Sequence, residues 1–368
     1  MTKKRITILS ILLSLCMLLG CASEKGVEAD VSATVPHSTA GGDNGAAETT
    51  EPAVPDKQQF LQRPPVGGTI YNKYDSFKKN VITVNNSDYV IPEEDVKGLL
   101  GVMNYNHYKY YDVGFYVLDL GSQMSFGYNA TDYFNPGCTR KAGMALAWFK
   151  QLEDTRIKIE NGQTFYVGQS TATLNTRYFY DGTDYMAGAG FVGRNGYRWY
   201  TYNDLLYYLL HESDNTAYQA MWNELGISKY KSMCNRLGIP EHPLDYKRDK
   251  LWTPMRPLDL GLIWQEIWNY KEKGSQEAEL LWHYVTHNKY NEIAKVVDGA
   301  DVIAHKAGSD DYGFHEAGIV VRGDNAYVVV AMSTVPLPVA NDDYDVIHMV
   351  IERIDPIMQD FYASNAQK

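Results

Sequence analysis

The strongest constraint on the fold of this chain is that strand-forming segments lie at both ends of a long region whose middle is helical. Residues 113–120 alternate as a β-strand does, and after a Gly-Ser turn residues 124–128 form a second strand. Two further strand-like segments, 318–321 and 326–332, lie near the end of the chain. Strands from both ends can pair in one antiparallel sheet with the intervening helices packed on it. The sequence therefore predicts an α+β fold.

Helical patterns fill most of the space between and around these strands. They rest on apolar residues at helical spacing and on capping residues such as Asn203, a possible N-cap. A glycine, Gly226, marks the end of one of them. The expected helices span residues 92–100, 138–152, 201–210, 215–225, 258–270 and 346–361.

Composition excludes several classes of protein. Of the 368 residues, 45% are hydrophobic, which excludes a wholly disordered chain. The formal net charge of −11 argues against a nucleic-acid partner, because nothing would neutralise the phosphates. Four cysteines are too few for a disulfide-built scaffold.

The N-terminus has the features of an export signal. Lys3, Lys4 and Arg5 precede an apolar run over residues 6–19, which is short for a membrane span. Gly20-Cys21 follows and resembles the lipobox of bacterial lipoproteins; the alternative is an ordinary cleaved signal with a chance cysteine. The resemblance implies that residues 1–20 are removed and that Cys21 is lipidated. The protein would then be exported and anchored by lipid to the outer face of the cell membrane, or to a membrane on its periplasmic side.

Beyond the signal, the chain divides into a spacer and one domain. Residues 21–66 are small, polar and nearly free of aromatic residues, so we expect a flexible tether there. Residues 67–368 form the expected globular domain. Tyrosine is frequent in it, with 29 in the chain, which indicates either an amphipathic surface or a wall that faces a glycan or peptide.

Three short motifs follow one another in the domain. They are Cys138-Thr-Arg-Lys141, Ser213-Asp-Asn215 and Lys306-Ala307-Gly308. A nucleophile at the first turn of a helix lies where the dipole favours negative charge, and a lysine three residues later lies on the same face. A desolvated lysine near a second cation can act as a base.

The other two motifs can complete such a site. Lys306 could be the second cation and could also hold a substrate carboxylate. Ser213 could pass a proton to a leaving nitrogen, and Asn215 could position both the lysine and a substrate amide. The backbone N–H groups of Cys138 and Ser309 could form an oxyanion hole.

With these motifs in this order, the chain resembles the superfamily of class A β-lactamases and penicillin-binding proteins, which carries Ser-x-x-Lys, Ser-Asp-Asn and Lys-Thr-Gly. The resemblance covers residues 100–362. It implies an α/β sandwich: a five-stranded antiparallel sheet flanked by helices, with an all-helical half inserted between its strands. It also implies acyl transfer and hydrolysis of β-lactams or D-alanyl cell-wall peptides by a monomer, without a cofactor.

The sequence departs from the family pattern at three positions. Cys138 replaces the nucleophilic serine, so the intermediate would be a thioester. Ala307 lacks the family's hydroxyl, which removes one hydrogen bond to a substrate carboxylate. Glu241, in Glu-His-Pro-Leu-Asp, is the nearest match to the glutamate that activates the deacylating water; the alternative is a surface turn built by prolines.

Alternatives remain open at this stage. The protein could be a catalytically silent, lipid-anchored binding or sensor module, or a thiol hydrolase of other amides or esters. A disulfide between Cys138 and Cys234 is possible. His305 could line the site or be structural. No metal site is expected, because His283 and His287 lack the acidic partner of an H-E-x-x-H motif.

Overall fold

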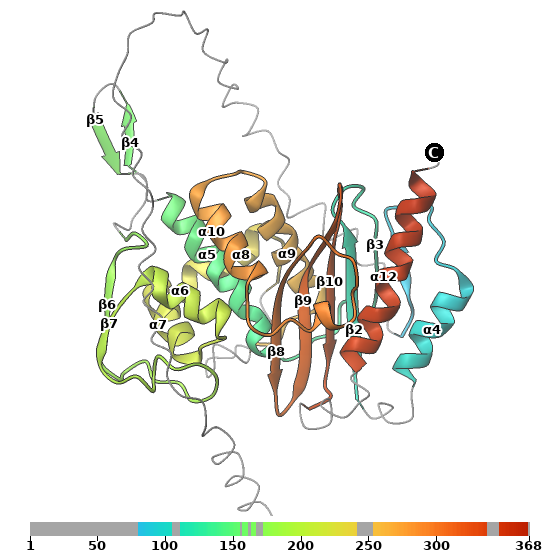
Figure 1. Ribbon diagram of the computed structural model, residues 1–368, viewed down its shortest axis with the longest axis horizontal. Coiled ribbons are helices and arrows are strands. Elements are labelled where there is room, and N and C mark those ends of the chain that lie inside the picture. The colour runs from blue at the N-terminus through green and yellow to red at the C-terminus, as the bar shows by residue number, and fades with distance from the viewer. Residues whose placement is uncertain are drawn as a thin grey trace, which may run out of the picture. The chain divides into compact units, whose positions relative to one another are not determined.

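An antiparallel sheet of six strands forms the centre of the fold (Figure 1). The computed structural model describes residues 80–104, 111–154, 157–160, 163–166, 172–240, 253–336 and 346–366. In spatial order the strands are β1 (Thr83–Asn85), β3 (Ser125–Tyr128), β2 (Val113–Asp119), β10 (Asn325–Ser333), β9 (Gly313–Arg322) and β8 (Val302–Asp310).

The sheet joins the two ends of the chain as predicted. β2 pairs with β10 along its whole length, from Val113↔Ser333 to Asp119↔Tyr327. The predicted number of strands is wrong, because β1 adds a sixth strand beside β3. Its three residues, Thr-Val-Asn, are too few to show an alternating pattern, so only the pairing reveals the strand.

β2 shows why the sheet needs a helical layer on each face. All seven of its residues are buried. Phe115 and Val117 pack into one hydrophobic cluster, whereas Tyr116 and Leu118 pack into another on the opposite face. Since alternate residues point to opposite faces of a strand, both faces must be covered.

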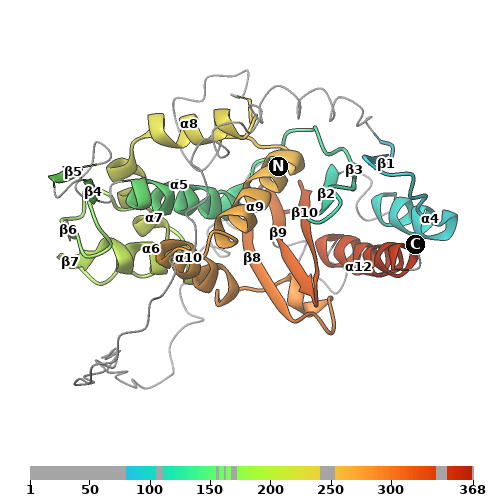
Figure 2. The ribbon, with the colours of Figure 1, turned by 90° about the horizontal axis from the view of Figure 1, so that it is seen from above.

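The two helical layers differ in composition. Figure 2 shows α4 (Glu93–Met103) and α12 (Val346–Asn365) on one side of the sheet, and the larger helical half on the other. That half contains α5 (Arg140–Asp154), α6 (Tyr202–His211), α7 (Asn215–Leu225), α8 (Ile227–Arg236), α9 (Pro257–Lys271) and α10 (Gln276–Thr286). The described part of the chain also contains two short 3-10 helices, η1 (Gly137–Thr139) and η2 (Ile293–Lys295).

The predicted helices are all present, with small changes at their ends. α7 has the predicted bounds and ends at Gly226, whose φ is +78°. The predicted cap of α6 is wrong. Thr201 caps the helix, because its hydroxyl accepts from the Asp204 amide while the Asp204 carboxylate accepts from the Thr201 amide. Asn203 instead accepts a hydrogen bond from the Tyr284 hydroxyl through its side chain.

The inserted half is not wholly helical, which corrects the expectation drawn from the family. Two hairpins interrupt it, β4 (Ile157–Glu160) with β5 (Gln163–Tyr166), and β6 (Arg177–Tyr180) with β7 (Arg198–Thr201). β6 and β7 consist mainly of aromatic and β-branched residues, which favour strands. Their pairing spans a long loop, so no short turn signal announces it.

Within the described ranges, no helix is both long enough and apolar enough to cross a bilayer. The signal segment, the tether and the proposed lipid site at Cys21 lie outside those ranges.

Candidate active site

Cys138 lies in a tight turn that leads into the buried helix α5. The turn is η1, and the α-helix begins at Arg140, two residues after the predicted start. Gly137 has a φ of +49°, a conformation that glycine adopts at little cost. The Thr139 hydroxyl donates to the Pro136 carbonyl at 2.6 Å and closes the turn. The Cys138 side chain remains partly exposed, so a substrate can reach it.

Lys141 brings the first and second motifs together. Its side chain is fully buried. Its Nζ donates to the Ser213 carbonyl at 2.5 Å and to Asn215 Oδ1 at 2.6 Å, and it lies 3.4 Å from Ser213 Oγ. Asn215 Oδ1 is 3.9 Å from Cys138 Sγ. The side-chain oxygen of Asn215 thus accepts from the lysine, and it accepts from Cys138 while the thiol is protonated.

Lys306 joins the same cluster from strand β8. Its Nζ donates to Ser213 Oγ at 3.0 Å and to the Ala307 carbonyl at 2.9 Å. Ser213 Oγ therefore lies between two ammonium groups. Ser213 itself has a φ of +54°, which is uncommon for a residue with a side chain and indicates a constrained position.

The electrostatics of the cluster favour a thiolate. Burial has the largest single effect on the pKa of the Cys138 thiol and raises it. Lys141 and then Lys306 outweigh it, together with hydrogen bonds from Ser213 and Lys141, so the pKa of the Cys138 thiol lies below its ordinary value of 9.0. Burial lowers the pKa of Lys306 to about 8, and Lys141 contributes, while Cys138 and Glu316 oppose the shift.

Asp214, the central residue of the second motif, holds the loop that carries Ser213. Its Oδ1 accepts from the Ala217 amide and caps α7, and its Oδ2 accepts from the amides of Phe191 and Val192 at 2.7 and 2.8 Å. One carboxylate thus fixes the start of a helix and a distant loop at the same point. A Cβ on Gly190 would lie 2.2 Å from this carboxylate, so only glycine fits there.

The third motif places backbone N–H groups beside the nucleophile. A Cβ on Gly308 would lie 2.8 Å from the Cys138 amide nitrogen, so β8 passes directly under η1. β8 is an edge strand, and the His305 carbonyl on its free edge accepts from Asn288 at 2.5 Å. Residues two or four apart on a strand direct their backbone N–H and C=O groups to the same edge of the sheet. Ser309 follows His305 by four residues, so its N–H also points to the free edge of β8. The amides of Cys138 and Ser309 can therefore form an oxyanion hole.

The remaining predicted residues have mixed outcomes. Ala307 lies in β8 and contributes only backbone there. His305 is fully buried, with Nδ1 3.5 Å from Glu316 Oε1, so it does not line the cleft. Glu241 lies outside the described residues. Cys138 and Cys234 are both free thiols, so the disulfide considered above is absent.

Two supports of the nucleophile turn were not anticipated. The Asn135 side chain donates to Asp310 Oδ2 at 3.0 Å, which ties the turn to the end of β8. The buried Arg140 guanidinium lies 4.9 Å from the ring centres of both Trp222 and Tyr230. The Asn-Pro-Gly and Asp-Asp-Tyr-Gly sequences indicate turns, but nothing local shows that they meet.

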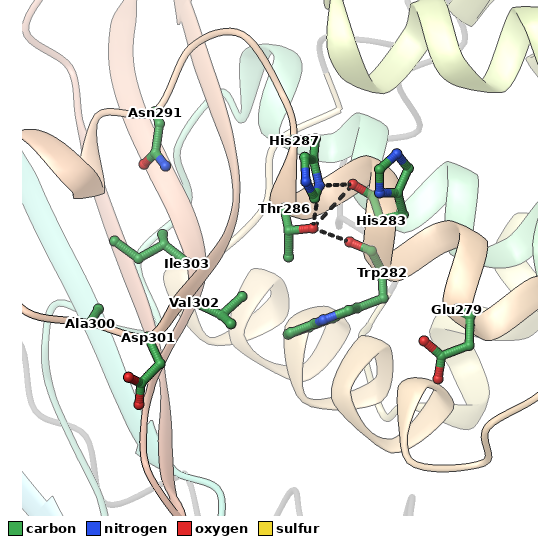
Figure 3. Close-up of a pocket in the computed structure, with 10 residues that line it drawn as sticks. All are labelled: Glu279, Trp282, His283, Thr286, His287, Asn291, Ala300, Asp301, Val302 and Ile303. Carbon is green, nitrogen blue, oxygen red and sulfur yellow. Dashed lines mark hydrogen bonds between the residues drawn. The ribbon is translucent and has the colours of Figure 1, made fainter. Parts of the chain in front are cut away.

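A separate pocket lies between α10 and the start of β8 (Figure 3). It measures about 580 Å³, and Trp282 and Ile303 are among its apolar residues. The ring centres of His283 and His287 lie 4.2 Å apart there, with the ring planes tilted by 37°. Burial, and then His287, lower the pKa of His283. No group of three or more candidate metal ligands occurs in the part of the chain that the structure describes.

Comparisons with known proteins bear on the family and the fold of the chain. A family model described as the β-lactamase enzyme family matches residues 92–353. No curated protein sequence matches significantly.

Similar solved structures include PBP-A, with 19% identity and a TM-score of 0.59 over 72% of this chain and 96% of PBP-A. A β-lactamase from Sphaerobacter thermophilus DSM 20745 has 17% identity and a TM-score of 0.57, over 71% of this chain and 95% of that protein. A class A β-lactamase from Mycobacterium abscessus has 18% identity and a TM-score of 0.55, over 73% and 99%. A PBP-A variant is known as an acyl-enzyme complex with penicillin G. These likenesses establish a β-lactamase or transpeptidase-like fold.

Proposed function

Because this chain belongs to the β-lactamase enzyme family, we propose that it is an acyl-transfer hydrolase that uses Cys138 as its nucleophile. Its substrates are β-lactams or D-alanyl cell-wall peptides. The observation that carries the proposal is the convergence of Lys141, Lys306, Ser213 and Asn215 on Cys138, with a thiol pKa held below its ordinary value.

The proposed acylation begins with the Cys138 thiolate. Its sulfur attacks the substrate carbonyl, and the amide N–H groups of Cys138 and Ser309 stabilise the oxyanion that forms. As the carbon–nitrogen bond breaks, the Ser213 hydroxyl donates its proton to the leaving nitrogen. Lys306, 3.0 Å from Ser213 Oγ, replaces that proton. The product is a thioester on Cys138.

The second half of the reaction transfers the acyl group to water. A base must deprotonate that water, and Glu241 is the candidate that the sequence offers. Without an effective base the thioester would persist or pass to an amine. We also propose that the domain is exported and held at a membrane through lipid on Cys21.

Intact-protein mass spectrometry after exposure to penicillin G tests the proposal. The reduced wild-type protein should gain the mass of one penicillin, and neutral hydroxylamine should remove it, as it removes a thioester. The Cys138→Ser variant should form an adduct that resists neutral hydroxylamine, and Cys138→Ala should form none. If folded wild-type protein and Cys138→Ser both stay unlabelled and neither consumes penicillin G, the silent binding module becomes the better description.

A further inference from the structure

One segment of the described chain carries a concentration of exposed aromatic side chains. Phe179, Tyr185, Tyr197 and Trp199 are 44%, 59%, 74% and 53% exposed, and all four lie within β6, β7 and the loop between them. The other large hydrophobic side chains that are exposed in the described ranges are distributed over several separate segments of the sequence. Since single exposed hydrophobic residues are normal, it is the grouping that indicates a binding surface.

Two of these residues form an ordered pair on the outer face of the β6–β7 hairpin. Phe179 lies directly opposite Trp199 in the strand register, and their ring centres are 5.1 Å apart. The Arg177 guanidinium stacks 4.7 Å from the Trp199 ring centre. On the inner face, Tyr180 and Tyr200 are buried. The inner face therefore attaches the hairpin to the domain, and the outer aromatic face is left open.

The same segment forms a wall of the candidate active site. The Asn215 side-chain Nδ2 donates to the Ala187 carbonyl at 2.8 Å, and the backbone N–H of Asn215 donates to the Ala189 carbonyl at 3.0 Å. The Asp214 carboxylate fixes Phe191 and Val192 of the same loop through their backbone amides. The loop that joins the two strands of the aromatic hairpin thus contacts Asn215, which in turn accepts a hydrogen bond from Lys141.

The charges beside the aromatic pair argue against a lipid surface. The exposed Asp181 directly follows β6, and the nearby Asp184 accepts hydrogen bonds from Tyr178 and Asn223. The same segment carries Arg177, Arg194 and Arg198, so its charges are of both signs, and it lacks the cluster of about four to eight basic residues that attracts an anionic bilayer. Carbohydrate fits better: the C–H face of a sugar ring packs on an aromatic face, and its hydroxyls donate to carboxylates.

We propose that the outer face of the β6–β7 hairpin, with Phe179, Trp199 and Tyr197, is a saccharide platform that holds the glycan of the cell wall beside the active site. The inference rests on the proposed function, because it names the part of a cell-wall substrate that lies beyond the reacting peptide. It also favours a glycan-facing role for part of the tyrosine-rich surface.

Sedimentation with purified peptidoglycan sacculi tests the platform. The Phe179→Ala/Trp199→Ala double variant should bind at least tenfold more weakly than wild type. Tyr290→Ala removes a comparably exposed aromatic residue elsewhere, 44% exposed, and should bind as wild type does. A soluble N-acetylglucosamine tetramer should release wild-type protein from the sacculi. Thermal unfolding of each variant checks that the fold is retained.

Labelling with penicillin separates this inference from the proposed function. All three proteins should acylate equally, because the platform lies outside the reacting cluster. If none is labelled but only the double variant loses sacculus binding, the proposed function fails and the platform stands. Wild-type binding by the double variant would overturn the platform. An equal loss of sacculus binding in Tyr290→Ala would overturn it too, as would release of the protein by a peptide but not by the sugar tetramer. The platform would also be overturned if the double substitution changed only binding to lipid vesicles or only dimer formation.

Discussion

At the scale of single residues, sulfur at position 138 changes the task of the neighbouring lysines. A serine hydroxyl must lose its proton during attack, so it needs a base. A thiol whose pKa is lowered can already be ionised before substrate arrives. Lys141 then acts mainly as a counter-ion, and Lys306, with a pKa of about 8, remains a proton donor near neutral pH.

The pH dependence of Cys138 alkylation should reveal this role of Lys141. In wild type the iodoacetamide rate should rise with pH around a midpoint below the ordinary thiol value. Lys141→Met removes the largest attractive charge, so the midpoint should move to higher pH, and the rate at pH 7 should fall by about tenfold per unit of that move. Lys150→Met, on the same helix but paired with Glu266, is the control and should leave the midpoint in place. An unchanged midpoint in Lys141→Met would contradict the ion pair.

The residues of the reacting cluster could be found from the sequence because each lies in a short motif. Their supports could not be found in the same way. Asn135 meets Asp310, and Asp214 meets Phe191, only after distant parts of the chain have packed together. Asp214 lies in a motif, but its local pattern shows only the helix cap and not the loop that it also holds.

At the scale of elements, glycines set the distances between the loops that build the site. Gly308 lets β8 pass under η1, and Gly190 lets the loop after β6 reach Asp214. A side chain at position 308 would collide with the backbone of the nucleophile turn, and one at position 190 would collide with the Asp214 carboxylate. The close approach of these elements is therefore a condition for the site.

Gly190→Ala should test this condition. Gly190 has a φ of +95°, and the added Cβ would lie 2.2 Å from the Asp214 carboxylate, so both strain and collision oppose it. We expect the free energy of unfolding to fall by about 2–4 kcal/mol. Gly196→Ala is the matched control, because the φ of Gly196 is +71° but no atom lies within 4 Å of the added Cβ. It should lower the free energy of unfolding by only about 1 kcal/mol. Urea unfolding measures both, and equal losses would show that the contact with Asp214 does not matter.

α7 shows how a strong local signal can lead to a correct prediction. α7 has an aspartate cap, a helical apolar pattern and a terminal glycine, and all of its bounds are as predicted. β8 and the β6–β7 hairpin were missed, because β8 mixes polar and apolar residues and the hairpin closes over a long loop. In both cases the partner strand, and not the local sequence, determines the structure.

At the scale of the whole molecule, the sheet is buried on both faces, so polar residues on its central strands are costly. His315 and Glu316 are neighbours on β9 and point to opposite faces, and each is almost fully buried. His315 Nδ1 accepts from the Ser333 amide at 3.2 Å. A buried imidazole can accept in this way only while that nitrogen is unprotonated.

Unfolding at mildly acidic pH should report this histidine. Burial lowers the pKa of His315 to about 3, against 6.5 for an exposed histidine. Below pH 6.5 the unfolded chain therefore binds a proton that the folded chain does not, and stability falls as the pH falls from 6.5 towards 3. Between pH 7.5 and 5.5 this residue should cost the folded state about 1.4 kcal/mol, before most carboxylates titrate.

His315→Asn isolates that contribution, because the Asn carbonyl can accept from Ser333 but does not titrate. The variant should be less stable than wild type at pH 7.5 because of imperfect packing. Its free energy of unfolding, measured in urea, should nevertheless decrease between pH 7.5 and 5.5 by about 1.4 kcal/mol less than that of wild type. Parallel pH profiles for the two proteins would mean that His315 takes up a proton in the folded state. That proton would then have to be accommodated on a side chain that is almost fully buried.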